Sequence, residues 1–289
     1  MKKTRLTLLA LAAAGALVLS GCASGGGEAG GGETETPEPA PTFAEGSTMA
    51  ALAEAGSITI GTKFDQPLFG LNGPNGPEGF DVEIGKIIAS ELGISEDNIE
   101  WKEAVSANRE PFIQNGEVDI VVATYTINDK RKEVVSFAGP YYMAGQSILV
   151  LADNDDITSE DDLIGQPVCS VTGSTPAANL EALGAEPLLT DTYSNCLEPL
   201  RNGTVVAVST DNVILAGLAA QNEGEFKVVG EPFTEEPYGI GLALDDTDFR
   251  MWINDVLEKA YEDGRYEDAW DATAGTVLPF IDPPAVDRY

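Results

Sequence analysis

Polar and charged side chains follow the predicted strands of this sequence at the points where the strands end. Lys63 lies just beyond the apolar run at 57–61, and Asp211 follows the run at 205–209. The other residues in such positions are Ser106, Arg109, Thr124, Thr126, Arg131, Ser174 and Thr175. Lysine and arginine compensate negative charge, and hydroxyl groups hydrogen-bond to it. These residue types favour the binding of a small anion.

Two of the cations occupy locally unfavourable positions. Arg109 and Arg131 each fall in the first turn of a predicted helix, where the helix dipole disfavours a cation by a few tenths to about 1 kcal/mol. Neighbouring Glu110 and Asp129 could neutralise them, so surface ion pairs are the alternative interpretation. Two cations at strand ends of an acidic chain favour an anionic ligand instead.

Strands alternate with helices along the chain, which predicts an α/β fold with mostly parallel sheets. The predicted strands are 57–61, 99–102, 118–123, 147–151, 167–171, 205–209 and 240–244, and the helices between them include 81–92, 128–135, 176–183, 213–220 and 248–262. Asp81 is the predicted cap of the first of these helices. Ligands of such sheets bind at the carboxyl ends of strands. At one such end, the turn Gly173–Pro176 offers free backbone N–H groups to an anion, with Thr175 as the predicted helix cap.

Composition narrows the function classes. The chain has 289 residues with 16 Lys and Arg against 48 Asp and Glu, and its net charge of -32 argues against a nucleic-acid partner. The absence of histidine excludes Ser-His-Asp nucleophile systems and most zinc chemistry. The composition does not exclude catalysis by the carboxylate groups of Asp and Glu. We expect neither a metal nor a cofactor.

The first residues predict export. Lys2, Lys3 and Arg5 precede an uncharged stretch at 6–19 that is too short to span a bilayer comfortably. Leu19-Ser20-Gly21-Cys22 resembles the bacterial lipobox, which implies cleavage after residue 21 and a lipid on Cys22; an ordinary secretory signal is the alternative. Residues 22–48 are rich in Gly, Glu, Pro and Thr, a composition typical of a flexible tether.

Two further cysteines suit the exported location. Cys169 and Cys196 form an even pair in an oxidising compartment, which predicts a disulfide between them. Two buried free thiols are the alternative.

Several segments together carry a family resemblance. Gly79–Ile84 reads GFDVEI, residues 119–142 read DIVVATYTINDKRKEVVSFAGPYY, and Gly173–Thr175 and Val206–Asn212 add two shorter segments. They resemble the polar-amino-acid substrate-binding proteins of ABC importers, the family 3 solute-binding proteins, and within them the glutamate-binding lipoproteins. The resemblance runs from about residue 50 to the end of the chain.

The resemblance implies a two-lobed fold of the type II periplasmic-binding-protein kind, with two crossing strands as a hinge. Residues 146–151 and 238–244 would be the crossings. Lobe 1 would comprise 49–147 and 244–289, and lobe 2 would comprise 148–243.

The resemblance also implies roles at the ligand's amino-acid end. Arg131 would grip the α-carboxylate, with Thr126 assisting and Ser174 and Thr175 closing over it. Asp211 would accept the α-ammonium group with the help of the Thr124 carbonyl; a helix cap for residues 213–220 is the alternative for Asp211. The family commonly has Thr where this chain has Asn128, so the contact made there stays open.

The ligand's distal end would face Lys63, Ser106 and Arg109, which by resemblance select an acidic side chain. A glutamate carboxylate between the two cations would be charge-compensated, whereas glutamine would leave a cation unpaired. Tyr193 would either donate to the same carboxylate or pack in the core.

These observations predict a monomeric lipoprotein on the outer face of the cell membrane that captures L-glutamate and delivers it to the permease of an ABC importer. Binding of aspartate or glutamine, a dehydratase-like enzyme on the same fold, and a sensory or adhesive lipoprotein are the alternatives. We expect binding without catalysis.

Overall fold

The computed structural model describes residues 41–289. The predicted signal peptide, the lipidated Cys22 and most of the predicted tether lie outside the described residues. Phe43, the one aromatic residue of that tether, packs edge-on against Trp252 with ring centroids 5.7 Å apart. No helix in the described range is long and apolar enough to cross a membrane.

Helices and strands alternate through most of the described chain. The α-helices are α1 (Thr48–Ala55), α2 (Phe80–Glu91), α3 (Arg109–Gln114), α4 (Asp129–Lys132), α5 (Thr175–Leu183), α6 (Leu197–Arg201), α7 (Asn212–Gln221), α8 (Thr247–Asp263) and α9 (Arg265–Ala272). The 3-10 helices are η1 (Glu96–Asn98), η2 (Ser106–Asn108), η3 (Glu160–Leu163), η4 (Tyr193–Cys196) and η5 (Ala274–Thr276).

The strands form two five-stranded sheets and a small third sheet in the described residues. The first sheet has the order β5 (Ile99–Glu103), β1 (Ile58–Thr62), β6 (Ile120–Val121), β13 (Glu236–Leu242), β7 (Ser136–Ala144). The second has the order β10 (Glu186–Thr190), β9 (Pro167–Val171), β11 (Ala207–Asp211), β8 (Gln146–Leu151), β12 (Phe226–Val229). The third joins β2 (Asp65–Gln66), β3 (Gly70–Gly73) and β4 (Gly76–Glu78).

Each large sheet has four strands that run in one direction and one strand that runs against them, so the sheets are mostly parallel, as expected, with one antiparallel strand each. In the first sheet β1 pairs in parallel with β5 and β6, whereas β13 is antiparallel to β6 and β7. In the second sheet β9 is parallel to β10 and β11, whereas β8 is antiparallel to β11 and β12. The antiparallel strands are those next to the passages between the sheets, where no crossover helix reverses the chain direction.

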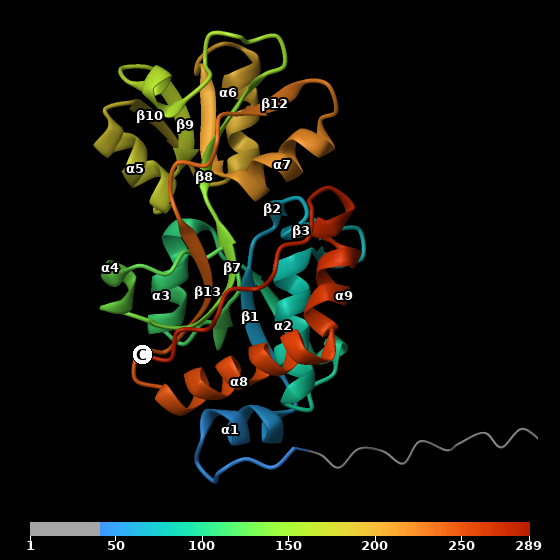
Figure 1. Cartoon of the computed structure of the whole chain (residues 1–289). Helices are drawn as coiled ribbons and strands as arrows, with labels where there is room; N and C mark the ends of the chain where they lie inside the picture. Colours follow the sequence, from blue (N-terminus) through green and yellow to red (C-terminus); the bar gives the residue numbers. More distant parts are fainter. Residues whose placement is uncertain (1–40) are drawn as a thin grey trace, which may run out of the picture. The chain divides into compact units, whose positions relative to one another are not determined.

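The chain passes between the two sheets at Gly145 and again over residues 230–235 (Figure 1). The expected crossing strands differ from this, because β8 lies wholly in the second sheet and β13 wholly in the first. A run of apolar residues predicts that a strand exists but not which sheet it joins. The lobe boundaries remain a prediction. Below, lobe 1 denotes the part built on the first sheet together with the small third sheet, whose strands β3 and β4 contact α2, and lobe 2 denotes the part built on the second sheet.

The N-termini of helices α5 and α2 are stabilised in different ways. Ser174, rather than the predicted Thr175, caps α5 by accepting a hydrogen bond from Ala177 N, and Gly184 ends the helix in the left-handed conformation. Helix α2 follows Gly79, whose φ of 125° disfavours any side chain, and begins without a side-chain cap. Asp81, read from the sequence as the cap of α2, is therefore free for another role.

Lobe 1 is centred on an aromatic cluster. The rings of Phe69, Phe80, Tyr142, Tyr238 and Trp270 contact one another at centroid distances between 5.1 and 6.4 Å. All are 5 % exposed or less. This packing fixes α2, which carries Asp81, and β13, which carries Tyr238.

Lobe 2 contains a disulfide between Cys169 on β9 and Cys196 on η4, with an S–S distance of 2.05 Å. Both cysteines are fully buried. The bond ties η4 to the central strands of the second sheet.

Candidate functional site

The predicted ligand-binding residues converge on a cavity between the two lobes. Its lining contains eight of them together with Pro176 and Ile214: Ser106, Arg109, Thr124, Thr126, Ser174, Thr175, Tyr193 and Asp211. The volume that the centre of a water molecule can occupy in this cavity is ≈ 10 Å³. This is about the minimum volume that holds a single water molecule. An amino acid is far larger, so the lobes or the lining side chains must move apart to admit one.

Lys63 and Arg131 are not part of this lining, and Arg131 instead lines an adjoining groove that shares Ser174 and Thr175 with the cavity. Lys63 is 3 % exposed, and its Nζ donates to Ser106 Oγ over 2.9 Å. The lysine thus reaches the cavity through a hydroxyl group that faces it.

Arg109 is held in place by backbone carbonyl groups. Its Nη1 donates to the carbonyl oxygens of Ala123 and Thr124 over 3.0 and 3.2 Å, and its Nε lies 3.3 Å from that of Ser106. The guanidinium carbon lies 4.2 Å from the centroid of the Tyr125 ring. In the described residues no carboxylate forms an ion pair with Arg109, and its side chain is buried. The surface ion pair that the sequence left as the alternative is therefore not formed by this arginine.

Lys63 and Arg109 are both buried, and they lie close enough for the charge of Arg109 to disfavour the charged form of Lys63. Burial, together with the charge of Arg109, lowers the pKa of Lys63 to about 7. Burial and the charge of Arg131 lower the pKa of Arg109 to about 10. An anion placed between Lys63 and Arg109 would offset both effects.

Arg131 bridges the lobes. Its Nη1 donates to Thr126 O over 2.7 Å and to Thr175 Oγ1 over 3.2 Å, and its Nη2 donates to Gly173 O over 3.0 Å. Its Nε lies 3.1 Å from Glu110 Oε1, so the ion pair considered from the sequence exists for this arginine. A grip on a ligand carboxylate would require Arg131 to exchange its contacts with lobe 2.

Asn128 has a local role that explains the position of Arg131. Its side-chain oxygen accepts a hydrogen bond from Arg131 N over 2.9 Å and so caps α4. The contact that the sequence left open at this position is therefore a helix cap.

Thr124 holds a strained backbone conformation at the floor of the cavity. Its φ is 44°, in the left-handed region that a β-branched residue rarely adopts, at a cost of about 1–3 kcal/mol. Its N–H donates to Asp81 Oδ2 over 2.7 Å, and its hydroxyl lies 2.9 Å from Gln66 Oε1. Tyr141 in turn donates to Asp81 Oδ1 over 2.6 Å. These buried partners hold Thr124 in a geometry that it would not adopt alone.

Sequence reasoning missed Asp81 and Gln66 as site residues. Both are fully buried, and burial raises the pKa of Asp81 to about 7 despite its hydrogen bonds to Tyr141 and Thr124. The only signal for Asp81 was its place in the segment Gly79–Ile84, and nothing in the sequence indicated that it contacts a residue 43 positions away.

Asp211 is a buried carboxylate with one oxygen unused. Its Oδ2 accepts from the Tyr238 hydroxyl over 2.6 Å, and no described residue hydrogen-bonds to its Oδ1. It makes no side-chain cap for α7, which removes the support for the helix-cap alternative. Burial and the nearby carboxylate of Glu236 raise the pKa of Asp211 above its ordinary range. A ligand ammonium group would satisfy this oxygen and reverse the shift.

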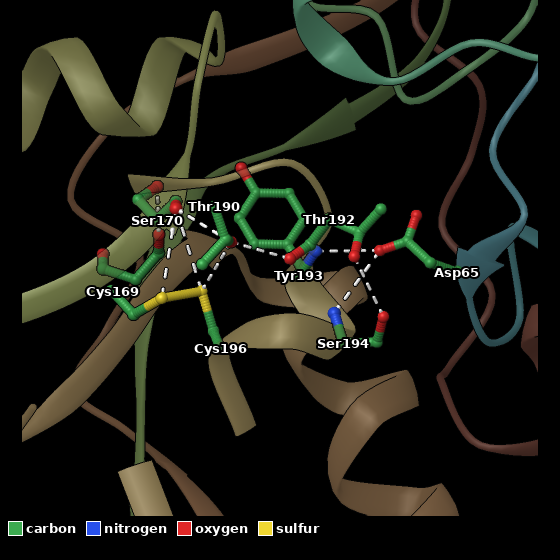
Figure 2. The surroundings of a disulfide bond; sticks show 9 residues. Asp65, Cys169, Ser170, Thr190, Thr192, Tyr193, Ser194 and Cys196 are labelled. Carbon is green, nitrogen blue, oxygen red and sulfur yellow. Dashed lines mark hydrogen bonds between the residues drawn. A yellow bond between two sulfur atoms is a disulfide. The ribbon is translucent and has the colours of Figure 1, made fainter. Parts of the chain in front are cut away.

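Tyr193 lines the cavity as the first residue of η4 (Figure 2). Burial and the charge of Asp211 raise its pKa to about 12, so its hydroxyl is protonated and can donate. The Cys169–Cys196 disulfide fixes the other end of η4 and thereby the backbone that carries this ring.

In sum, the described residues form a two-lobed α/β protein of the type II periplasmic-binding kind, with a small polar cavity between the lobes. Residues 58–271 match the bacterial extracellular solute-binding proteins, family 3, and the chain belongs to this family.

Relatives and solved structures agree with this assignment. The chain is 47% identical over 235 residues to the glutamate-binding protein GluB of Corynebacterium efficiens, covering 77% of this chain and 80% of that protein. It is 38% identical over 227 residues to the ABC transporter glutamine-binding protein GlnH of Bacillus subtilis, covering 77% and 83%. An ancestral arginine-binding protein bound to glutamine is similar with a TM-score of 0.71 and 35% identity, over 75% of this chain and 97% of that chain. A solute receptor for L-cysteine of Neisseria gonorrhoeae has a TM-score of 0.76 and 30% identity, covering 83% and 99%.

Proposed function

We propose that this protein is the substrate-binding component of an ABC importer and that it captures L-glutamate between its lobes for delivery to the permease. One observation carries the choice of ligand: the cavity is lined by buried Arg109, with buried Lys63 behind Ser106, and by buried Asp211, whose Oδ1 has no described partner. Glutamate carries the complementary charges, with two carboxylates and one ammonium group. The names of the GluB relatives support the same ligand.

The distal carboxylate of glutamate binds between Lys63 and Arg109, with Ser106 as a hydroxyl partner. Both cations are at most 3 % exposed, so their charges are weakly screened and their mutual repulsion is relieved by an anion. An uncharged ligand end relieves none of it. Tyr193 donates its hydroxyl from lobe 2 to the same region.

The amino-acid end of the ligand binds at the opposite side of the cavity. Asp211 Oδ1 and the Thr124 carbonyl accept the ammonium group, and Thr126, Ser174 and Thr175 surround the α-carboxylate. Arg131 exchanges its contacts with Gly173 O and Thr175 Oγ1 for the two carboxylate oxygens, which its planar fork fits.

The N-terminal sequence supports a location of this function at a membrane surface. Cleavage after residue 21, a lipid on Cys22 and the tether at 22–48 hold the binding lobes outside the cell membrane as a monomer. Lobe 1 comprises about 49–147 and 244–289 with the strand β13 (Glu236–Leu242) added to it, and lobe 2 comprises the rest of 148–243. The protein works without a cofactor and without catalysis.

Glutamine is the second candidate, and one observation favours it. A lysine whose pKa is about 7 is partly neutral at physiological pH, and a neutral amine can accept a hydrogen bond from an amide N–H. The name of the GlnH relative points the same way.

Calorimetric titration of the purified protein with glutamate, aspartate and glutamine tests the proposal. We expect tight 1:1 binding of glutamate, weaker binding of glutamine, and no product after prolonged incubation. A preference for a neutral or cationic amino acid would overturn the ligand assignment. Turnover of any ligand would overturn the binding-only function.

A further inference from the structure

The two lobes also contact each other outside the ligand cavity. Asp65, on the small third sheet of lobe 1, points its carboxylate at the start of η4 in lobe 2 (Figure 2). Its Oδ2 accepts a hydrogen bond from Tyr193 N over 2.8 Å and lies 3.4 Å from Ser194 N. Asp65 does not line the cavity. One carboxylate oxygen thus joins the two lobes through backbone N–H groups.

A second contact lies next to the first. Gly217, inside α7 of lobe 2, faces the carbonyl group of Pro67 in lobe 1. A Cβ at Gly217 would fall 3.1 Å from the Pro67 carbonyl carbon and closer still to its oxygen, so no side chain fits there while the lobes touch. Glycine inside a helix lowers its stability by about 1 kcal/mol relative to alanine, and the helix itself gives no reason for one at this position.

We infer that Asp65 and Gly217 determine the affinity of the site by stabilising the closed arrangement of the lobes, although neither touches the ligand. We call their two contacts, Asp65 with Tyr193 and Ser194 and Pro67 with Gly217, the closure contact. The inference rests on the proposed function, because it concerns how tightly the same cavity retains its amino acid. A ligand that binds only between closed lobes gains whatever free energy the closure contact adds to the closed state.

The receiving side of the closure contact is rigid. Cys196 ends η4 and is bonded to Cys169 on β9, so the backbone that presents the two N–H groups is anchored to the second sheet. The same short helix carries Tyr193 into the cavity. Docking of Asp65 therefore also positions a cavity-lining side chain.

The test compares Asp65→Ala and Gly217→Ala with wild type by glutamate titration, thermal unfolding and small-angle X-ray scattering. Asp97→Ala is the matched control, because Asp97 is an exposed lobe 1 carboxylate in η1 with the same charge. We expect Asp65→Ala to weaken glutamate binding about ten- to hundredfold. Asp65→Asn retains one acceptor oxygen and should fall between Asp65→Ala and wild type.

Gly217→Ala gives a signature that misfolding cannot mimic. We expect glutamate affinity to fall about five- to hundredfold. The unfolding temperature of the ligand-free variant should not fall, since alanine favours the helix. At glutamate saturation the radius of gyration of Gly217→Ala should exceed that of wild type, because the added methyl group blocks full closure, whereas Asp65→Ala should match wild type.

Wild-type affinity and wild-type scattering in both variants would overturn the inference. If wild type itself binds no amino acid, the proposed function fails, and ligand-free scattering then decides the closure contact separately. A larger ligand-free radius in Asp65→Ala and Gly217→Ala than in Asp97→Ala would support it, and equal radii would overturn it.

Discussion

The two sides of the cavity are built differently. On the lobe 1 side, Arg109 and Thr124 are fixed before any ligand arrives, the first by three backbone carbonyl groups and the second by Asp81 and Gln66. On the lobe 2 side, Asp211 keeps an unused oxygen: among the described side chains that line the cavity, its Oδ1 is the one buried polar atom without a hydrogen-bond partner. Lobe 1 therefore presents a preorganised surface, and lobe 2 retains polar capacity that a ligand can fill.

This difference separates selectivity from retention. A preorganised cation pair in lobe 1 discriminates between ligand side chains without reorganisation, since the protein groups are already in place. Lobe 2 contributes contacts to the amino-acid backbone that all such ligands share, and these form only when the lobes meet. Changes at Lys63 or Arg109 in lobe 1 should alter which amino acid binds, whereas changes at Asp211 in lobe 2 should alter how tightly every amino acid binds.

The largest expected effect concerns the stability of lobe 2. Its disulfide closes a separation of 27 residues, and replacing Cys169 and Cys196 together by Ser should lower the free energy of unfolding by about 3.6 kcal/mol on loop-closure entropy. Chemical denaturation measures this loss. Glutamate affinity should fall with little change in the glutamate-to-glutamine ratio, because the cations lie in lobe 1. A changed ratio would break the separation between the two sides.

Arg109→Ala should act on selectivity. We expect glutamate affinity to fall by about 3 kcal/mol, since one of the two charges facing its distal carboxylate is lost, and glutamine affinity to fall much less. Parallel titrations with the two ligands check this. Arg109→Lys restores a cation and should recover part of the preference, and Lys227→Ala on the exposed surface of lobe 2 serves as the control. Equal losses for all amino acids would contradict the assigned role.

The sequence predicts interactions between residues that are close together in the chain, and it does not predict interactions between residues that are far apart in the chain. The turn Gly173–Pro176 and the start of α5 were predicted because capping depends on residues three positions apart, although Ser174 and not Thr175 makes the cap. Asp81 was read as a helix cap because its actual partner, Thr124, is remote in the chain. Asp65 was not identified at all, since its partners lie in the other lobe.

The same limit applies to the fold. The alternation of apolar and polar segments predicts most of the parallel strands, whose neighbours are set by intervening helices. It could not predict that β7 and β13 pair antiparallel. The reason is that β7 precedes the lobe 2 segment in the sequence and β13 follows it. Long-range pairing is decided by burial of both faces, which a single segment does not reveal.

Asp211→Asn should weaken binding of every amino acid by about 2 kcal/mol, because a neutral amide attracts the ammonium group less. The same change should stabilise the ligand-free protein, as the raised pKa of Asp211 means that its charged form is disfavoured in the fold. The sign follows directly: this penalty is absent below the unfolded pKa and grows as pH rises through the range between the unfolded and folded values. Thermal unfolding should therefore show a larger gain at pH 8 than at pH 5, and an equal gain at both would argue against a buried charge.

The smallest expected effect is a pH dependence of affinity that arises from Lys63. Burial and the charges of Arg109 and Arg131 lower its pKa to about 7, and Asp65 and Asp81 oppose this shift. A bound distal carboxylate raises this pKa, so above pH 7 glutamate binding takes up a proton and affinity falls by up to about tenfold per pH unit. Below pH 7 Lys63 is charged in both the free and the bound state and contributes no pH dependence of the affinity.

Titration at pH 8 in buffers of different ionisation enthalpy should reveal the proton uptake, and Lys63→Arg, which stays charged, should abolish it. Uptake that persists in Lys63→Arg would place the titrating group outside the preorganised cation pair.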